Sequence, residues 1–130
     1  MTSAGNVNND VAFEEFYPSS YDYPNIMSVG AVDQAGEETS FTSFGKVDCY
    51  ANGFEVMSYV PGGHEMKMSG TSLSSPQVMN LAGKLLALKP DLTVAQLRQL
   101  ILDGCDGKEA GDRMAMLVNP KRSLELLKEM

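Results

Sequence analysis

The chain has 130 residues, with 17 acidic and 10 basic side chains that give a formal net charge of −7. This charge argues against nucleic acid and anionic membranes as partners, because both attract basic surfaces. Hydrophobic residues make up 43% of the sequence, which is enough for a buried core and excludes a disordered chain. No apolar run approaches the ~18 residues of a membrane span. The opening stretch MTSAGNVNND has neither a basic nor an apolar leader segment, so we expect no signal peptide.

The first half of the chain predicts a long loop followed by short strands. Residues 5–25 are rich in Asn, Asp, Ser, Tyr and Pro, which is typical of a loop. Residues 26–32, IMSVGAV, form an apolar run that predicts a strand covered on both faces, as in a parallel sheet. A second strand is expected over 47–52 and a third over 54–60. Residues 61–68, PGGHEMKM, are expected to form a flexible loop.

The second half predicts three helices. Apolar residues recur at helical spacing over 72–88, and the few charges there indicate a deeply buried helix. Thr93 and Gln96 form a capping-box pattern that opens a second helix, which ends near Gly104. An Asn-Pro pair at 119–120 supplies a cap and a first-turn proline for a third, amphipathic helix.

Histidine and cysteine are too scarce for a disulfide framework or for a metal site built from these residues. Cys49 and Cys105 do not make a disulfide framework or a metal site, and we expect free or buried thiols rather than a disulfide. His64 is the single histidine, which excludes a metal site built from several histidines. The acidic pair Glu14 and Glu15 is interpreted as a solvated loop face, so no metal ligands are assigned.

The stretch MSGTSLSSPQV, residues 68–78, crowds small and hydroxyl residues in front of the first helix. Ser72 is expected where the helix starts, at backbone N–H groups that have no helical acceptor and carry positive partial charge. Such a position favours negative charge, for example the oxyanion of an acyl-transfer intermediate. Gly70 permits close approach of the chain, and Pro76 is expected in the first turn. Taken alone, the stretch is also explained by an ordinary Ser/Thr helix cap followed by a first-turn proline, without any catalytic role.

Several motifs in order resemble the subtilisin-like serine proteases. The segment GTSLSSP at 70–76 is similar to their Gly-Thr-Ser-Met-Ala-Ser-Pro motif, and SAGN at 3–6 to their Ala-Ala-Gly-Asn segment. Further similarity lies in NIMSVGAVD, in TSFTSFGKVDCYANG and in LLALKPDLTVAQLRQLI, so the resemblance covers essentially the whole chain. The sequence departs from the family pattern at Asn52, where proline is usual, and at Gln77 and Met79-Asn80, where His and Ala-Gly are usual.

The resemblance implies an α/β fold for residues 1–130. They would form the C-terminal portion of a subtilisin-like doubly wound parallel sheet, incomplete without its N-terminal half. It also implies a serine endopeptidase in which Ser72 is the nucleophile and Asn6 helps to hold the oxyanion. The expected substrate-binding residues are the pocket wall Ser3, Ala4 and Gly5, the pocket floor Phe16, and the motif residues Gly70 and Thr71.

In this family the Asp and His motifs precede the Asn segment, so we expect the general base and its carboxylate to lie outside this chain. The order Asp-His-Ser is also spelled by Asp33 or Asp48, His64 and Ser72, but His64 lies in the loop leading to the serine motif rather than in a His-Gly-Thr-His-like segment. We therefore expect the isolated chain to be inactive. The alternative interpretation is a non-catalytic, truncated or interaction module that keeps a remnant of the fold.

The family resemblance extends to cofactors, partners and location. Members often bind calcium, but no ligand set in this chain matches theirs residue by residue. The implied partners are a polypeptide substrate and the missing N-terminal half of the domain, without which we expect the chain to associate with copies of itself. Secretion is the habit of the family and is expected for the parent protein.

Overall fold

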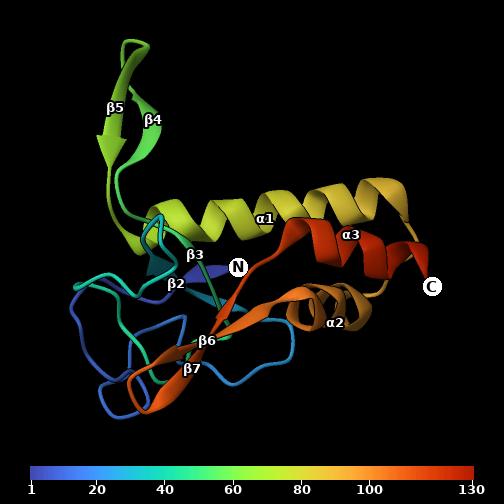
Figure 1. Cartoon of the computed structure of the whole chain (residues 1–130), viewed down its shortest axis with the longest axis horizontal. Coiled ribbons are helices and arrows are strands. Elements are labelled where there is room, and N and C mark those ends of the chain that lie inside the picture. Colours follow the sequence, from blue (N-terminus) through green and yellow to red (C-terminus); the bar gives the residue numbers. More distant parts are fainter.

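The computed structural model describes all 130 residues and centres on a five-stranded sheet (Figure 1). The strand order is β1-β2-β3-β7-β6, and every pairing is parallel except that of β6 with β7. The strands are β1 (Thr2–Ser3), β2 (Ser28–Val32), β3 (Cys49–Asn52), β6 (Asp106–Ala110) and β7 (Arg113–Leu117). The mixed α/β class expected from the sequence is therefore present.

Strand β2 is the buried centre of the parallel part. All five of its residues are buried, as the apolar run in the sequence predicts. Its register with β3 places Val29 beside Cys49 and Ala31 beside Ala51. Because side chains alternate along a strand, these four residues point to the same face of the sheet.

Three helices gather on that face (Figure 1): α1 (Thr71–Leu88), α2 (Val94–Gly104) and α3 (Pro120–Lys128). The predicted caps are confirmed. Thr93 and Gln96 form a reciprocal capping box, and the Asn119 side chain accepts a hydrogen bond from the N–H of Arg122. The main core lies between the helices and the sheet and contains Met27, Val29, Cys49, Ala51, Val78, Leu81, Ala82, Leu85, Leu92, Leu100, Ile101, Cys105 and Leu127.

Loops cover the opposite face of the sheet. A smaller buried cluster there consists of Val32, Tyr50 and Ala115. The hydroxyl of Thr42, in the loop after β2, accepts a 3.0 Å hydrogen bond from the N–H of Ala31. This hydroxyl lets a loop cover a polar backbone group that would otherwise be buried without a partner.

An ion pair joins α2 to the sheet. One Arg98 guanidinium nitrogen lies 2.7 Å from the Asp48 carboxylate, and another donates a 2.8 Å hydrogen bond to the carbonyl of Ile26. The second Asp48 oxygen accepts the N–H of Ser28 at 2.8 Å. The charged side chains thereby hold α2 against the loop that leads into β2.

The structure differs from the sequence expectations at the β4–β5 hairpin, at the β6–β7 hairpin and along α1. Residues 64–68 are not a loop, because β5 (His64–Met68) pairs antiparallel with β4 (Val56–Val60) around a Pro-Gly-Gly turn. The β6–β7 hairpin, which adds two strands to the sheet beside β3, has no counterpart among the elements expected from the sequence. Helix α1 is not buried all round: only one face is covered, while Met79 is 52% and Leu88 66% exposed.

The β4–β5 hairpin stands away from the rest of the molecule, above the start of α1 (Figure 1). It forms a separate two-stranded sheet that leads directly into that helix. No helix of the chain is both long and apolar enough to cross a membrane.

Both cysteines are free and buried in the main core, as expected. Burial raises the pKa of the Cys105 thiol to about 11 and raises that of Cys49 well above its usual range. Since the thiolate is the reactive form, a raised pKa leaves little of it near neutral pH.

We therefore expect both thiols to react slowly with a disulfide reagent in the folded chain at about pH 8 and rapidly in guanidinium chloride. Counting the released chromophore over time checks this. Two thiols that react equally fast in both conditions would contradict the buried placement of Cys49 and Cys105.

Candidate active site

Ser72 is the second residue of α1, and it is exposed. The helix begins after Gly70, which has no side chain to cap it, and no acidic residue lies in its first turn. The positive partial charge of this helix end is therefore not neutralised by a neighbouring carboxylate. The N–H of Thr71 is bonded to the Asn6 side-chain oxygen and that of Leu73 to the carbonyl of Gly70, whereas the N–H of Ser72 itself has no acceptor and can receive an anion.

The start of α1 is held against the end of β3 by close backbone contact. The N–H of Gly70 donates a 2.8 Å hydrogen bond to the carbonyl of Gly53, which directly follows the strand. A Cβ atom at Gly53 would lie 2.4 Å from the Ser74 hydroxyl and 2.6 Å from the Ala31 side chain. Only a glycine at position 53 permits this approach, which places Ser72 at the carboxyl edge of the sheet.

Asn6 is fixed beside the serine motif through Thr71. The Asn6 side-chain oxygen accepts hydrogen bonds from both the N–H and the hydroxyl of Thr71, each at 2.8 Å. Because an N–H can only donate, the atom facing Thr71 is the carbonyl oxygen, so the amide NH2 is turned away from it. That NH2 lies toward Gly70, where a Cβ would be 3.4 Å from the nitrogen.

Pro76 lies deeper in α1 than the sequence suggests, while Gln77 lies inside the helix as expected. Pro76 is the sixth helical residue and not a first-turn residue, so its missing N–H leaves the carbonyl of Ser72 without its usual i+4 donor. The Gln77 side chain donates to the carbonyls of Asn52 at 2.6 Å and Leu73 at 2.8 Å. Gln77 thus ties the first turns of the helix to β3 at one of the positions that depart from the family pattern.

Ser3, Ala4 and Gly5 run from the edge strand to Asn6, and Phe16 lies against them. The aromatic Cδ1 of Phe16 would be 3.4 Å from a Cβ at Gly5, and the ring remains 42% exposed. Gly5 has φ of +117°, a conformation that favours glycine. The structure thereby brings together the predicted wall, the predicted floor residue and the serine motif.

Ser43 is a residue of this site that the sequence did not single out. Its N–H donates to the carbonyl of Gly5 at 2.9 Å, and its hydroxyl donates to the Asn9 side chain at 2.8 Å. A Cβ at Gly5 would lie 2.9 Å from that hydroxyl. The pairing is long-range, so no local pattern in the sequence indicates it.

His64 is not brought to Ser72. It lies at the far end of β5, four strand steps of about 3.3 Å, or roughly 13 Å, beyond Met68. It is exposed there, and it pairs with Val60 across the hairpin turn. Glu14 and Glu15 bond to Asn9 and Tyr17, and no three His, Cys, Asp or Glu side chains lie close enough to hold a metal ion.

Residues 1–115 match the family model described as the subtilase family. The chain belongs to this family. A thermophilic serine proteinase from Bacillus sp. (strain AK1) is 41% identical over 86 residues, covering 65% of this chain and 20% of the relative. Subtilisin-like protease 1 from Arthroderma otae is 34% identical over 121 residues, covering 90% of this chain and 24% of the relative. The chain thus spans less than a third of the length of these subtilases.

Solved structures agree with this assignment. A cold-adapted subtilisin-like serine proteinase has a TM-score of 0.79 at 28% identity, covering 88% of this chain and 42% of the other. A protease from Pseudoalteromonas arctica has a TM-score of 0.85 at 19% identity, covering 96% of this chain and 41% of the other. This similarity shows a common fold. The α/β fold is therefore that of a subtilase, of which this chain represents a part.

The Asn6–Thr71 contact can be tested by a matched pair of substitutions. In Thr71→Val the hydroxyl is lost, and the N–H of Gly5, which bonds to it at 3.3 Å, loses its acceptor. We expect a loss of about 1–3 kcal/mol in the free energy of unfolding, measured by urea denaturation. The NMR signals of the Asn6 carboxamide should also move.

Thr71→Ser keeps the hydroxyl and serves as the control. It should leave the Asn6 carboxamide signals near their wild-type positions. A larger shift in Thr71→Ser than in Thr71→Val would show that the methyl group of Thr71, and not its hydroxyl, determines the geometry of Asn6.

Proposed function

We propose that this chain carries the nucleophile and the oxyanion site of a subtilisin-like serine endopeptidase. The observation that carries the proposal is the fixed Asn6 amide. Its oxygen is bound to Thr71, and a Cβ at Gly70 would lie 3.4 Å from its NH2 and 3.8 Å from the backbone nitrogen of Ser72, so both donors lie beside Gly70. In this function the Ser72 hydroxyl attacks the peptide carbonyl and forms an acyl-enzyme, while the Asn6 NH2 and the Ser72 N–H stabilise the oxyanion.

A serine hydroxyl needs a general base to attack at neutral pH. The single histidine of the chain lies at the tip of the hairpin, away from Ser72. The base and the carboxylate that orients it therefore belong to residues outside these 130. By themselves, the 130 residues would behave as the alternative module, which keeps the fold without the reaction.

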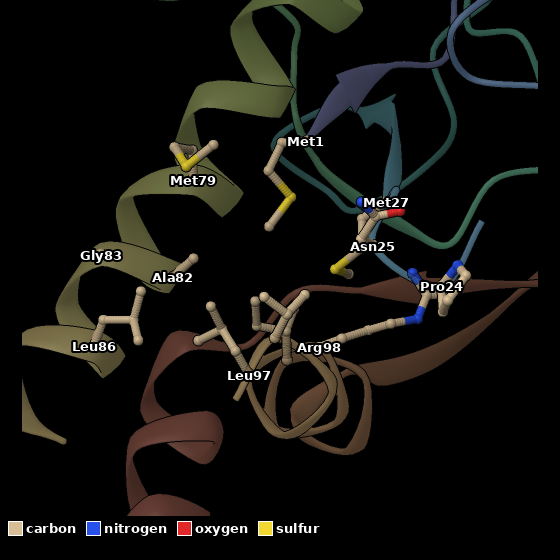
Figure 2. A pocket seen from close by; sticks show the side chains of 12 residues that line it. Met1, Pro24, Asn25, Met27, Met79, Ala82, Gly83, Leu86, Leu97 and Arg98 are labelled. Atoms are coloured by element: carbon tan, nitrogen blue, oxygen red, sulfur yellow. The ribbon is translucent and has the colours of Figure 1, made fainter. Parts of the chain in front are cut away.

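An apolar groove supports the proposal that a further part of a subtilase domain packs on this chain. The groove has a volume of about 230 Å³ and lies between β1, α1 and α2 (Figure 2). Its lining includes Met1, Met27, Met79, Leu86 and Leu97. When no such part is bound, association of copies of the chain through this groove would cover the same side chains.

The absence of a base predicts low reactivity. We expect the pure 130-residue chain to react with a fluorophosphonate probe no faster than its Ser72→Ala variant, because the Ser72 hydroxyl is not activated. Mass spectrometry of the labelled chain measures this. Stoichiometric labelling at Ser72 would overturn the assignment of the base to residues outside the chain.

Phe16 supports a preference for small side chains in the residue before the scissile bond, because its ring occupies space beside the pocket wall. In the whole peptidase we expect Phe16→Gly to raise kcat/KM for substrates with Phe or Leu at that position. The gain should be roughly tenfold to a hundredfold, since burying such a side chain is worth about 1.5–3 kcal/mol.

The control is Phe13→Gly, since Phe13 is 86% exposed and lies outside the pocket wall. It should leave the preference unchanged in the same substrate panel. A wild-type enzyme that already prefers Phe or Leu would show that Phe16 does not fill the pocket.

A further inference from the structure

The β4–β5 hairpin places three potential metal ligands in a row. His64, Met66 and Met68 alternate along β5 with Glu65 and Lys67. Because successive side chains of a strand point to opposite faces, the imidazole and the two thioethers lie on one face. Their cross-strand neighbours on β4 are Val60, Ser58 and Val56, none of which carries a charge.

The opposite face of the hairpin is used differently. It carries Met57 and Tyr59 from β4, paired with Lys67 and Glu65 from β5. The Tyr59 hydroxyl donates a 3.0 Å hydrogen bond to the Glu65 carboxylate. The only positively charged residue of β5, Lys67, is therefore kept away from the row of ligands.

The ligand face is open to solvent. Met66 is 54% and Met68 40% exposed, and the imidazole of His64 is exposed beside the turn. Gly62 has no side chain that would cover the imidazole; a Cβ at this position would lie 3.3 Å from the imidazole Cδ2. Neighbouring ligands are two strand steps, or about 6.7 Å, apart at Cα, and the three flexible bonds of a methionine side chain let two thioethers converge on one ion.

We propose that His64, Met66 and Met68 bind a soft monovalent metal ion, Cu(I). Thioether sulfurs are soft ligands that select Cu(I), and imidazole completes a three-ligand set of one nitrogen and two sulfurs. All three ligands are neutral, so a singly charged ion matches the site better than a hard divalent ion, which prefers carboxylates. The net charge of −7 favours the approach of any cation. The site is independent of Ser72 and of the peptidase proposal.

Silver(I) is the probe, because it has the same charge and ligand preference without redox chemistry. The full 130-residue chain, labelled with ¹³C in its methionine methyl groups, is titrated with silver nitrate in a chloride-free buffer. One equivalent should shift the methyl signals of Met66 and Met68 together with the ring signals of His64. The signal of Met57, on the opposite face of the same hairpin, should stay in place.

A second pair of methionines gives a matched control. Met114 and Met116 on β7 have the same spacing and are also exposed, but no histidine lies on their strands. Met66→Leu and His64→Ala should each weaken silver binding by roughly tenfold or more, since even lost supporting groups cost this much at metal sites. The double variant Met114→Leu/Met116→Leu should bind like the wild type.

The substituted side chains are exposed, so the variants are expected to keep the fold, and far-UV circular dichroism checks this. Equal shifts of all exposed methionines, or equal affinity of the β5 and β7 pairs, would overturn the proposal. A competition assay with a Cu(I)-selective chelator under reducing conditions then tests the ion itself. A chain that fails to withdraw Cu(I) from the chelator, yet binds silver, would also refute the proposed ion.

Discussion

The site depends on the contact between two glycines, where the first turn of α1 meets the end of β3. The N–H of Gly70 bonds to the carbonyl of Gly53, and Ser74 occupies the space that a side chain at position 53 would need. This contact determines how closely the first turn of the helix approaches the end of β3. Apolar packing at Val78, Leu81 and Leu85 then holds the remainder of α1 in place, each side chain being almost fully buried.

Polar contacts fix the groups around this contact. Thr71 fixes the orientation of the Asn6 amide by binding its oxygen, and Gln77 joins the helix to the last residue of β3. Each contact links segments that are distant in the chain. A reacting group held in this way loses little further freedom on binding substrate, which is the physical basis of preorganisation at active sites.

The sequence predicted the features that local chemistry determines. The capping box at Thr93, the apolar run of β2 and the small-residue motif before α1 were all readable, because each depends on neighbours within a few positions. The β6–β7 hairpin was missed because it carries charges at Asp106, Lys108 and Glu109 and lacks a long apolar run. The glycine pair before residues 64–68 predicts a loop, and in the structure it forms the turn that joins two strands.

The contacts of Asn6 and Ser43 could not be predicted, because they join residues that are distant in the sequence. Asn6 lies 65 positions from its partner Thr71, and Ser43 lies 38 positions from its partner Gly5. The predicted burial of α1 failed for a related reason. The sequence shows that the helix is apolar, but the covering of each face depends on what packs there. In these 130 residues only the face toward the sheet is covered.

The two edges of the main sheet differ in how readily each would pair with a further strand. At one edge, β6 carries charged side chains, and its Lys108 is engaged by Glu37 at 2.8 Å and by the carbonyl of Ala35 at 2.7 Å. Charges of this kind discourage strand addition. At the other edge, β1 has only two residues and borders the apolar groove. If two copies paired through their β1 edges, the same edge of each would be used, and such a self-complementary contact would close at the dimer and not propagate into a fibre.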